Sequence, residues 1–422
     1  MNQNISVSKK RNRKHFGKFF IFILLILLIA FLAYTFISKS DKNVSEQVST
    51  TTTTAPETEP DISVNMTILG DIMCHSTNFK EAYDATTKTY DFSSVFSQIT
   101  NYVTSADIAI GNVETTFAGE SRGYSGYPTF NTPAALATDL VELGVDVVST
   151  ANNHSLDKGY TGLVSTLDEL DKVGIAHTGT YRSTEEQNTI TYKDVKGVKF
   201  AFLSFTYGTN GIPVPSGKDY CVNLINKDLI KQQIELAKAG NPDIICVNMH
   251  WGLEYKSNQN SEQEDLADFL FENGVDLIFG SHPHVLEPME KRTVTLADGT
   301  TKDGFVIYSL GNFMSGQVIA ETRNSLILNL KVTKHGDTGK ITIDSYDYIP
   351  TYMLDTSTAE ANKYKILDIR ACIADYENGG NIINKATYNK LTASLEKIEK
   401  LMGPNMDFTK TTDTIGTDTN SK

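Results

Sequence analysis

The sequence predicts an α/β fold, in which β-sheets carry helices on their faces, and three observations support this. Short apolar runs rich in β-branched residues alternate with segments of helical apolar spacing through most of the chain. Several of these runs, such as 145–150 and 275–280, stop abruptly at polar side chains, as buried parallel strands do at their carboxyl ends. With 422 residues, 40% of them hydrophobic, the chain can also bury a large core.

The amino-terminal segment has the composition of a membrane anchor. Residues 1–18 form a basic tail, and the uncharged run 19–37 has the length that a helix needs to cross a bilayer. A cleaved signal peptide is the alternative, but residues 34–38 offer no small-residue cleavage pattern. Because the basic residues come first, the positive-inside rule leaves the tail in the cytoplasm. We therefore expect a single-pass protein of the cell membrane whose carboxyl-terminal domain is extracytoplasmic.

The next segment and the overall charge describe how that domain is presented. Residues 38–62 are rich in Ser and Thr and lack the large apolar groups that would order them, which predicts a disordered stalk. Residues 1–42 hold eight basic residues and one acidic residue, so they carry +7 of a formal net charge of −13, and the remainder carries −20. Such an acidic domain argues against nucleic acid as a partner. A polyanionic substrate would need local positive charge, which bound metal ions could supply.

The four cysteines, Cys74, Cys221, Cys246 and Cys372, are widely spaced and form no zinc-binding or C-x-x-C pattern. Disulfides are permitted outside the cell, but four cysteines in so long a chain do not make a disulfide framework. Cys246 lies in an apolar run and is expected to be an inert core residue.

The main domain is expected over residues 63–350, and its first half reads as strands separated by helices. The run 64–70 alternates apolar and polar residues and then turns at Gly70-Asp71, and the run 106–114 repeats this arrangement. The run 145–150 gives the next strand. The expected helices, which have apolar spacing near 3.6 residues, are 92–103, 133–143 and 162–173.

The second half opens with a hairpin, because the alternating runs 190–195 and 199–205 meet at Lys196-Gly197. Further strands are expected at 243–252, 275–284, 304–313, 325–332 and 340–348, with helices at 227–239 and 261–273. Residues 351–402 are expected to form a helical extension, with helices at 359–376 and 388–402. Residues 403–422 are expected to be a disordered tail.

Two loops rich in Gly, Pro and Tyr, 119–133 and 207–217, are long enough to overhang a site. Surface loops without such a task would look the same.

Metal-binding side chains follow the predicted strands at the same relative position. These are Asp71, Asn112, Glu114, Asn153, His154, His250, His282 and His284. Parallel strands bring their carboxyl ends to one edge of a sheet, so we expect these side chains to converge. Carboxylate and amide oxygens together with imidazoles suit one or two divalent ions of Mn, Fe or Zn. Two such ions could clamp a phosphoryl group and generate hydroxide at neutral pH.

The motifs at these positions resemble those of the CapA/PgsA family, the capsule or poly-γ-glutamate biosynthesis proteins related to calcineurin-like metallophosphoesterases. The resemblance covers roughly residues 63–350. It is carried in order by Gly70-Asp71-Ile72-Met73, Gly111-Asn112-Val113-Glu114, Ala151-Asn152-Asn153-His154 with Asp157, His250-Trp251-Gly252, Gly280-Ser281-His282-Pro283-His284 and Ser309-Leu310-Gly311-Asn312-Phe313.

The resemblance implies a four-layer α/β/β/α sandwich with a metal site at the carboxyl ends of two central sheets. In it, Asp71 would be the first metal-binding aspartate, and Asn112 or Glu114 would stand at the bridging position. Asn153 would be the amide ligand, and His154, with Asp157 in the same motif, would assist the leaving group. His250 and His282 would serve one ion and His284 the other, and Asn152, Trp251 and Asn312 are further site candidates.

Two departures from the phosphoesterase pattern bear on activity. Met73 stands where a D-x-H motif has its histidine, and Asn112 stands where a bridging carboxylate is expected. Loss of ligands should weaken one site, so a single ion, or a site that binds without turnover, also fits. His75 could replace the missing imidazole or could be an ordinary loop residue.

Three functions follow as hypotheses. The first is a membrane-anchored CapA-like component of capsule or poly-γ-glutamate biosynthesis or export, which handles an anionic polymer such as poly-γ-glutamate. No nucleotide-binding loop is evident, so ATP-driven polymerisation would reside in partner capsule synthetase subunits. The second is an active metal-dependent phosphoesterase or related hydrolase that uses metal-bound hydroxide, with His154 as general acid. The third is a non-catalytic surface binding domain.

Overall fold

The computed structural model describes residues 59–296, 299–355 and 364–410. The expected basic tail, the run 19–37 and nearly all of the stalk lie outside the described residues, as does the end of the carboxyl-terminal tail. Among the described residues, no helix combines the length and apolar character needed to cross a bilayer.

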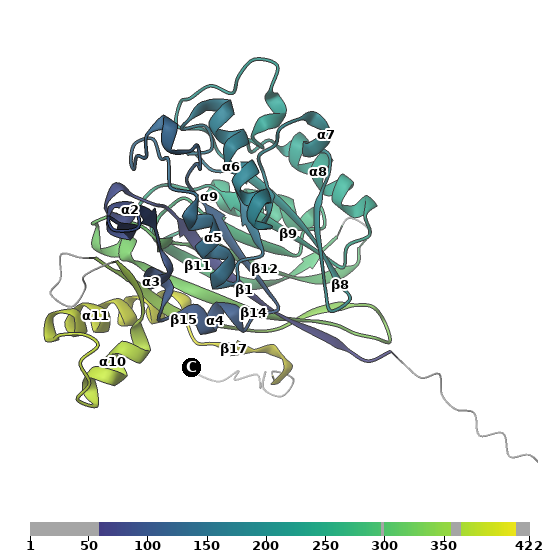
Figure 1. Cartoon of the computed structure of the whole chain (residues 1–422). Helices are drawn as coiled ribbons and strands as arrows, with labels where there is room; N and C mark the ends of the chain where they lie inside the picture. Colours follow the sequence, from purple (N-terminus) through teal and green to yellow (C-terminus); the bar gives the residue numbers. More distant parts are fainter. Residues whose placement is uncertain (1–58, 297–298, 356–363, 411–422) are drawn as a thin grey trace, which may run out of the picture. The chain divides into compact units, whose positions relative to one another are not determined.

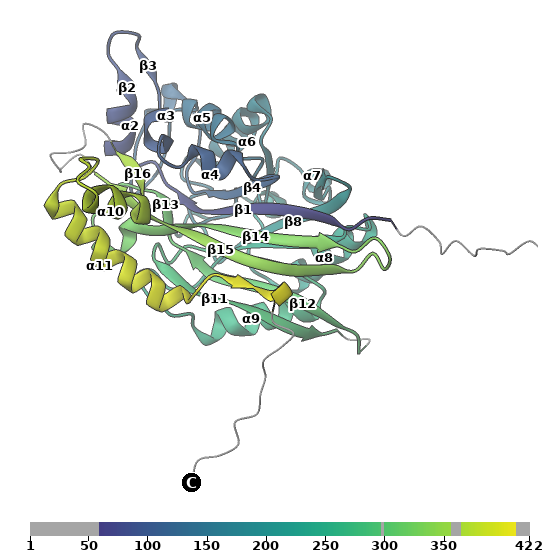
Figure 2. The ribbon, with the colours of Figure 1, turned by 90° about the horizontal axis from the view of Figure 1, so that it is seen from below.

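The first sheet of the described domain has nine strands and is parallel where it carries the predicted motifs. β1, β4, β5 and β6 run parallel to one another, and β14 and β15 extend the sheet antiparallel beyond β1 (Figure 2). The order is β16 (Lys365–Asp368), β15 (Ile341–Leu354), β14 (Asn324–Lys334), β1 (Ile62–Ile72), β4 (Ile108–Val113), β5 (Val147–Ser149) and β6 (Ala176–Thr178), with β13 (Asn312–Met314) paired to β1 and β17 (Met406–Asp407) to β15.

The second sheet has six strands, of which the four central ones are parallel. Its order is β11 (Leu286–Thr295), β12 (Thr301–Leu310), β10 (Leu277–Ser281), β9 (Ile244–His250), β8 (Val198–Thr206) and β7 (Thr191–Val195). The antiparallel pair of β7 and β8 confirms the predicted hairpin. A separate short pair consists of β2 (Tyr83–Asp84) and β3 (Thr89–Tyr90).

Alternating side chains of the strands build three apolar layers. Ile108 and Ile110 of β4 face the second sheet, where they join Phe200 and Phe202 of β8 in one core. Ala109, between them, faces the helices on the other side. The outer face of the second sheet packs in the same way against two helices. This arrangement confirms an α/β fold with the expected four layers (Figure 1).

The helices covering the two sheets are mostly those that the apolar spacing predicts. The first sheet is covered by α2 (Ser76–Ala82), α3 (Ser93–Phe96), α4 (Thr100–Thr104), α5 (Ala135–Leu143) and part of α6 (Gly159–Val173), and the second by α8 (Lys227–Ala239) and α9 (Ser261–Glu272). A short α7 (Thr184–Gln187) lies between β6 and β7, while α10 (Ile369–Glu377) and α11 (Lys385–Met402) extend the core between the sheets.

The structure differs from the sequence expectation at three places. The helix expected at 92–103 is broken between α3 and α4. Residues 359–363 of the helix expected at 359–376 lie outside the described residues, and in the remainder β16 precedes a helix that begins at Ile369. Ile366 and Leu367 face opposite apolar layers, as successive strand residues do. The segment 403–410 is ordered at its centre, where Met406–Asp407 pairs with β15.

Candidate metal centre

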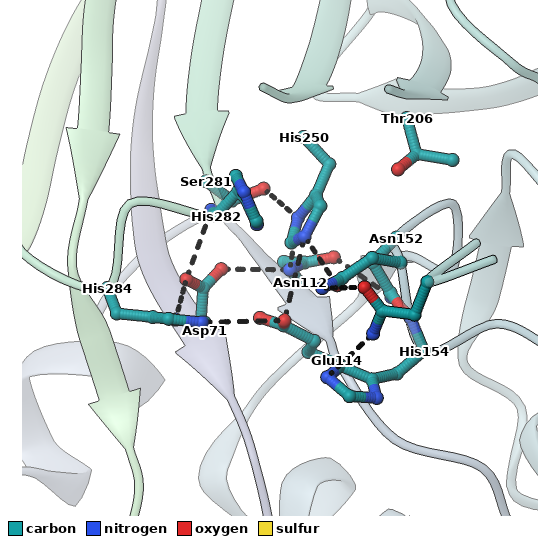
Figure 3. A network of polar contacts seen from close by, with 12 residues as sticks. Asp71, Asn112, Glu114, Asn152, His154, Thr206, His250, Ser281, His282 and His284 are labelled. Atoms are coloured by element: carbon teal, nitrogen blue, oxygen red, sulfur yellow. Dashed lines mark hydrogen bonds and ion pairs between the residues drawn. The ribbon is translucent and has the colours of Figure 1, made fainter. Parts of the chain in front are cut away.

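The carboxyl ends of β1, β4, β9 and β10 meet at one place between the two sheets. Strand register aligns Asp71 of β1 with Asn112 of β4, and His250 of β9 with Ser281 of β10. The polar side chains that follow these strands therefore lie in one cluster (Figure 3). The seven metal-ligand candidates and His154 are all buried, although none has an apolar side chain.

Glu114 is the centre of this cluster. It is fully buried and belongs to two groups of donor atoms, each within 4.8 Å of one another: Glu114 with His282 and His284, and Glu114 with Asp71 and His250. Neither of its carboxylate oxygens has a hydrogen-bond partner. A single carboxylate shared by two donor groups is the arrangement that bridges two ions.

Several buried polar atoms of the cluster have no hydrogen-bond partner, and a divalent cation would pair with them. Besides both Glu114 oxygens, Nδ1 of His282 is buried without a hydrogen-bond partner. Buried polar atoms are nearly always paired, and an unpaired buried carboxylate is unfavourable. Burial, followed by repulsion from Asp71, raises the pKa of Glu114 well above its usual range. A bound cation would pair with these atoms and remove the penalty.

Burial also keeps the imidazoles in the neutral form that binds metal. It lowers the pKa of His250 well below the usual value and that of His282 to about 3, and in each case neighbouring histidines lower it further. The cluster therefore offers neutral imidazole nitrogens next to carboxylate oxygens, a donor set that suits Mn, Fe or Zn.

His284 is oriented by Asn312. The Nδ1 atom of His284 lies 3.0 Å from Oδ1 of Asn312. Because the Asn312 amide nitrogen donates to Gln317 and to the carbonyl of Thr322, its oxygen must face His284. His284 Nδ1 therefore carries the proton, and Nε2, 4.0 Å from Oε1 of Glu114, keeps its lone pair for a metal.

His250 is held on both sides. Its Nδ1 lies 2.8 Å from Oγ of Ser281, and its Nε2 lies 2.9 Å from Oδ1 of Asn153 and 3.5 Å from Oε1 of Glu114. Asn153 thereby brings an amide oxygen to the donor group of Asp71 and His250.

The backbone around these ligands is strained or closely packed. His282 and His284 have φ of 98° and 61°, a region that residues with side chains seldom adopt. A Cβ at Gly280 would lie 1.8 Å from the carbonyl oxygen of Tyr308, and one at Gly70 would lie 2.1 Å from that of Gly311. These two glycines let the motif turns approach neighbouring backbone, and the strained histidines are aimed by the surrounding fold.

Asn112 supports the cluster from outside the two donor groups. Its amide nitrogen donates to Oδ1 of Asp71 at 2.8 Å, and its oxygen faces the amide of Asn152 at 3.5 Å. Asn152 in turn donates to the carbonyl of Val113 at 2.8 Å. Of the two candidates for the bridging position, the geometry therefore favours Glu114, and Asn112 orients Asp71. The donor groups also place His282 with His284, whereas the resemblance implied His282 with His250.

His154 and Asp157 form a buried pair beside the donor groups. Nδ1 of His154 lies 2.7 Å from Oδ2 of Asp157, which also accepts from the backbone amide of Phe130 at 2.6 Å. The carboxylate can only accept, so Nδ1 of His154 carries the proton and Nε2 is directed away from Asp157. The Phe130 ring lies edge-on to the imidazole of His154, with the two ring centroids 4.7 Å apart. The loop 119–133 therefore does reach the site.

Three residues named from the sequence lie outside the donor groups. His75 accepts the amide of Gly316 at Nδ1, 3.1 Å away, and does not supply the imidazole missing at Met73. Burial lowers its pKa to about 4. Trp251 donates to the carbonyl of Tyr308 at 2.9 Å and packs in the core on the outer face of the second sheet. Met73 is buried, and its backbone amide pairs with Met314.

Sequence reasoning did not identify the contribution of the loop after β8. The ring of Tyr207 lies 4.4 Å from that of His282, and Asn210 contacts both Asn153 and His154. No periodic pattern distinguishes these residues within the loop, and its length alone suggested that it overhangs a site.

The fold and the site define a four-layer α/β protein whose parallel strands end in a buried carboxylate and imidazole cluster suited to divalent ions. Residues 65–317 match the family model described as "Bacterial capsule synthesis protein PGA_cap", and the chain belongs to this family. The match confirms the resemblance to CapA proteins that the motifs carry.

Two curated relatives illustrate the relationship. The chain is 29% identical over 280 residues to the capsule biosynthesis protein CapA of Bacillus anthracis, which covers 65% of each chain. It is 30% identical over 270 residues to the PGA biosynthesis protein CapA of Bacillus subtilis (strain 168), which covers 62% of this chain and 65% of the relative. The chain thus matches about two thirds of the length of these relatives.

Among solved structures, the calcineurin-like phosphoesterase YfkN from Bacillus subtilis is similar with a TM-score of 0.41 and 15% identity. The match covers 81% of this chain and 98% of that one. A similarity at this level decides nothing about activity, which has to be argued from the site.

Proposed function

We propose that this chain is a membrane-anchored, extracytoplasmic component of the machinery that makes or exports a capsule or poly-γ-glutamate polymer, and that its metal centre is hydrolytic. Membership of the capsule synthesis family supports a role in making or exporting such a polymer. The observation that carries the hydrolytic centre is the unpaired, fully buried Glu114 shared by two donor groups. The replacements at Met73 and Asn112 leave these donor groups intact.

In this proposal, Asp71 and His250, with the oxygen of Asn153, would hold one divalent ion, and His282 and His284 would hold a second. Glu114 belongs to both donor groups and would serve both ions. Bound Mn, Fe or Zn would supply Lewis-acid activation of water and of a phosphoryl or carbonyl oxygen. The protein would contribute a dry, fixed arrangement, because His284 is oriented by Asn312 and His250 by Ser281.

His154 is the proposed general acid. Asp157 holds the Nδ1 proton of the imidazole, which leaves Nε2 to carry a proton to a leaving group. The carboxylate also stabilises the protonated ring electrostatically. Both side chains come from the same short segment after β5, so their relative position is fixed by local backbone.

The proposed location and partners follow from the sequence. The run 19–37 would anchor the chain, and the acidic domain would lie outside the membrane. An anionic polymer such as poly-γ-glutamate would approach the site through the bound cations, and an ATP-dependent capsule synthetase subunit would make the polymer. Protease treatment of intact cells should degrade the domain and leave the basic tail protected.

The function is tested with the full chain in detergent, loaded with Mn, against bis-p-nitrophenyl phosphate and poly-γ-glutamate. We expect turnover of at least one of them that falls about 10²–10⁴-fold in His154→Ala. The matched control is His335→Ala, because His335, just after β14, pairs with Asp61, just before β1, and contacts no residue of the cluster. A protein that binds Mn without turnover would support the polymer-handling subunit, and one that binds no Mn would support the non-catalytic binding domain.

A further inference from the structure

The loop that follows β8 touches both halves of the candidate site. Tyr207, its first residue, places its ring 4.4 Å from that of His282 and 6.3 Å from that of His250. Asn210, three residues on, contacts Asn153 and His154. None of the six motifs that carry the family resemblance includes this loop.

The orientation of the Asn210 amide is determined by its neighbours. Its oxygen accepts from the amide nitrogen of Asn153 at 3.1 Å and from the hydroxyl of Tyr207 at 3.3 Å. Its nitrogen therefore faces Nε2 of His154, 3.5 Å away. The backbone of Asn210 has φ of 50°, a conformation that asparagine tolerates better than most residues.

This contact determines which atom of Asn153 faces the cluster. The Asn153 oxygen lies 2.9 Å from Nε2 of His250, and its nitrogen donates to Asn210. While Tyr207 donates to the Asn210 oxygen, a flipped Asn153 amide would place two oxygens against each other at Asn210 and would present N–H groups, which cannot bind a cation, to the donor group. The acceptor on Asn210 therefore selects the orientation that binds metal.

We propose that Asn210 is a positioning residue of the metal centre: its amide oxygen holds the Asn153 amide with its oxygen toward the ions. The inference rests on the proposed metal centre. Tyr207 stabilises this arrangement, because its hydroxyl donates to Asn210 while its ring lies against His282.

Calorimetric titration of the metal-free full chain with Mn tests this role without relying on activity. We expect Asn210→Ala to weaken Mn binding about 10–100-fold, the effect typical of losing a residue that orients a ligand. Asn210→Asp keeps an acceptor for Asn153 and should bind at least as tightly as the wild type. The matched control is Asn241→Ala, because Asn241 also has φ of 50° but lies in the loop before β9, at the opposite end of that strand from His250.

The outcomes separate the two proposals. Equal Mn affinity in the wild type, Asn210→Ala and Asn241→Ala would overturn the role of Asn210 and leave the metal centre standing. Equal weakening in Asn210→Ala and Asn210→Asp would also overturn it, because the acceptor would then be irrelevant. A wild type that binds no Mn would overturn the metal centre and the role of Asn210 together. Thermal melts of the metal-free variants show whether each is folded.

Discussion

The Nε2 atom of His250 lies 3.5 Å from Oε1 of Glu114, yet neither oxygen of Glu114 has a hydrogen-bond partner. Both residues are buried, so bulk solvent does not reach the carboxylate. His250 and Glu114 are potential ligands that face each other without a hydrogen bond between them. A cation between the strand ends could bind both. The predictions below follow from this relationship.

Removing metal should lower thermal stability, because ions bind the folded cluster and not the dispersed ligands of the unfolded chain. At free Mn about 100 times the Kd, binding adds about 2.7 kcal/mol to the free energy of unfolding. Melting of the full chain in detergent, with Mn and with a chelator, measures the difference. Identical midpoints under the two conditions would contradict the prediction.

Asn312→Ala should weaken metal binding about 10–100-fold, because the imidazole of His284 then loses the acceptor that fixes its orientation. Asn329→Ala is the matched control, because Asn329 lies on β14 and bonds to Asp347 and Thr67 outside the cluster. Calorimetric titration with Mn compares the two variants, and equal affinities would count against the orientation of His284 described above.

Asp157→Asn should reduce turnover less than His154→Ala and leave metal content unchanged. The asparagine oxygen can still accept from His154, but it lacks the negative charge that favours the protonated imidazole. Turnover measured beside metal analysis separates the two effects. A loss of metal in Asp157→Asn would mean that the pair supports the ions and does not serve proton transfer.

A buried carboxyl outside the two donor groups should make stability depend on pH. Burial raises the pKa of Glu287 from 4.5 to about 7, although Gln263 donates to it. Between these values the unfolded chain binds fewer protons than the folded one, so stability falls as pH rises, by up to roughly 3 kcal/mol. Urea unfolding from pH 4.5 to 7.5 should show a flatter dependence for Glu287→Gln. Parallel curves for the two proteins would contradict this.

The sequence predicts the fold and most of the donor atoms because both depend on strands. Apolar runs that stop at polar residues identify the strands, and parallel register places Asp71 beside Asn112 in the first sheet and His250 beside Ser281 in the second. The same pattern could not decide whether Asn112 or Glu114 is the shared ligand. That choice depends on tertiary contacts, because Asp71 and Asn152 engage the side chain of Asn112 and not that of Glu114.

Other features depend on contacts that a local pattern does not contain. Asn210 lies in a loop without periodicity, and its partners in the site, Asn153 and His154, are more than fifty residues away in the chain. β16 is short enough to resemble the start of the helix that follows it, and only the two apolar layers on its faces identify it as a strand. His75 has the sequence position of a ligand, but Gly316 engages its ring nitrogen.

The central claim is that Glu114 is the shared ligand of a divalent metal centre, and elemental analysis of the full chain purified in detergent tests it most directly. Glu287→Gln serves as the control, because Glu287 is likewise buried with an unpaired oxygen. We predict one to two ions of Mn, Fe or Zn per chain in the wild type and in Glu287→Gln, and almost none in Glu114→Gln. A wild type without metal, or a Glu114→Gln variant with the metal content of the wild type, would contradict the account.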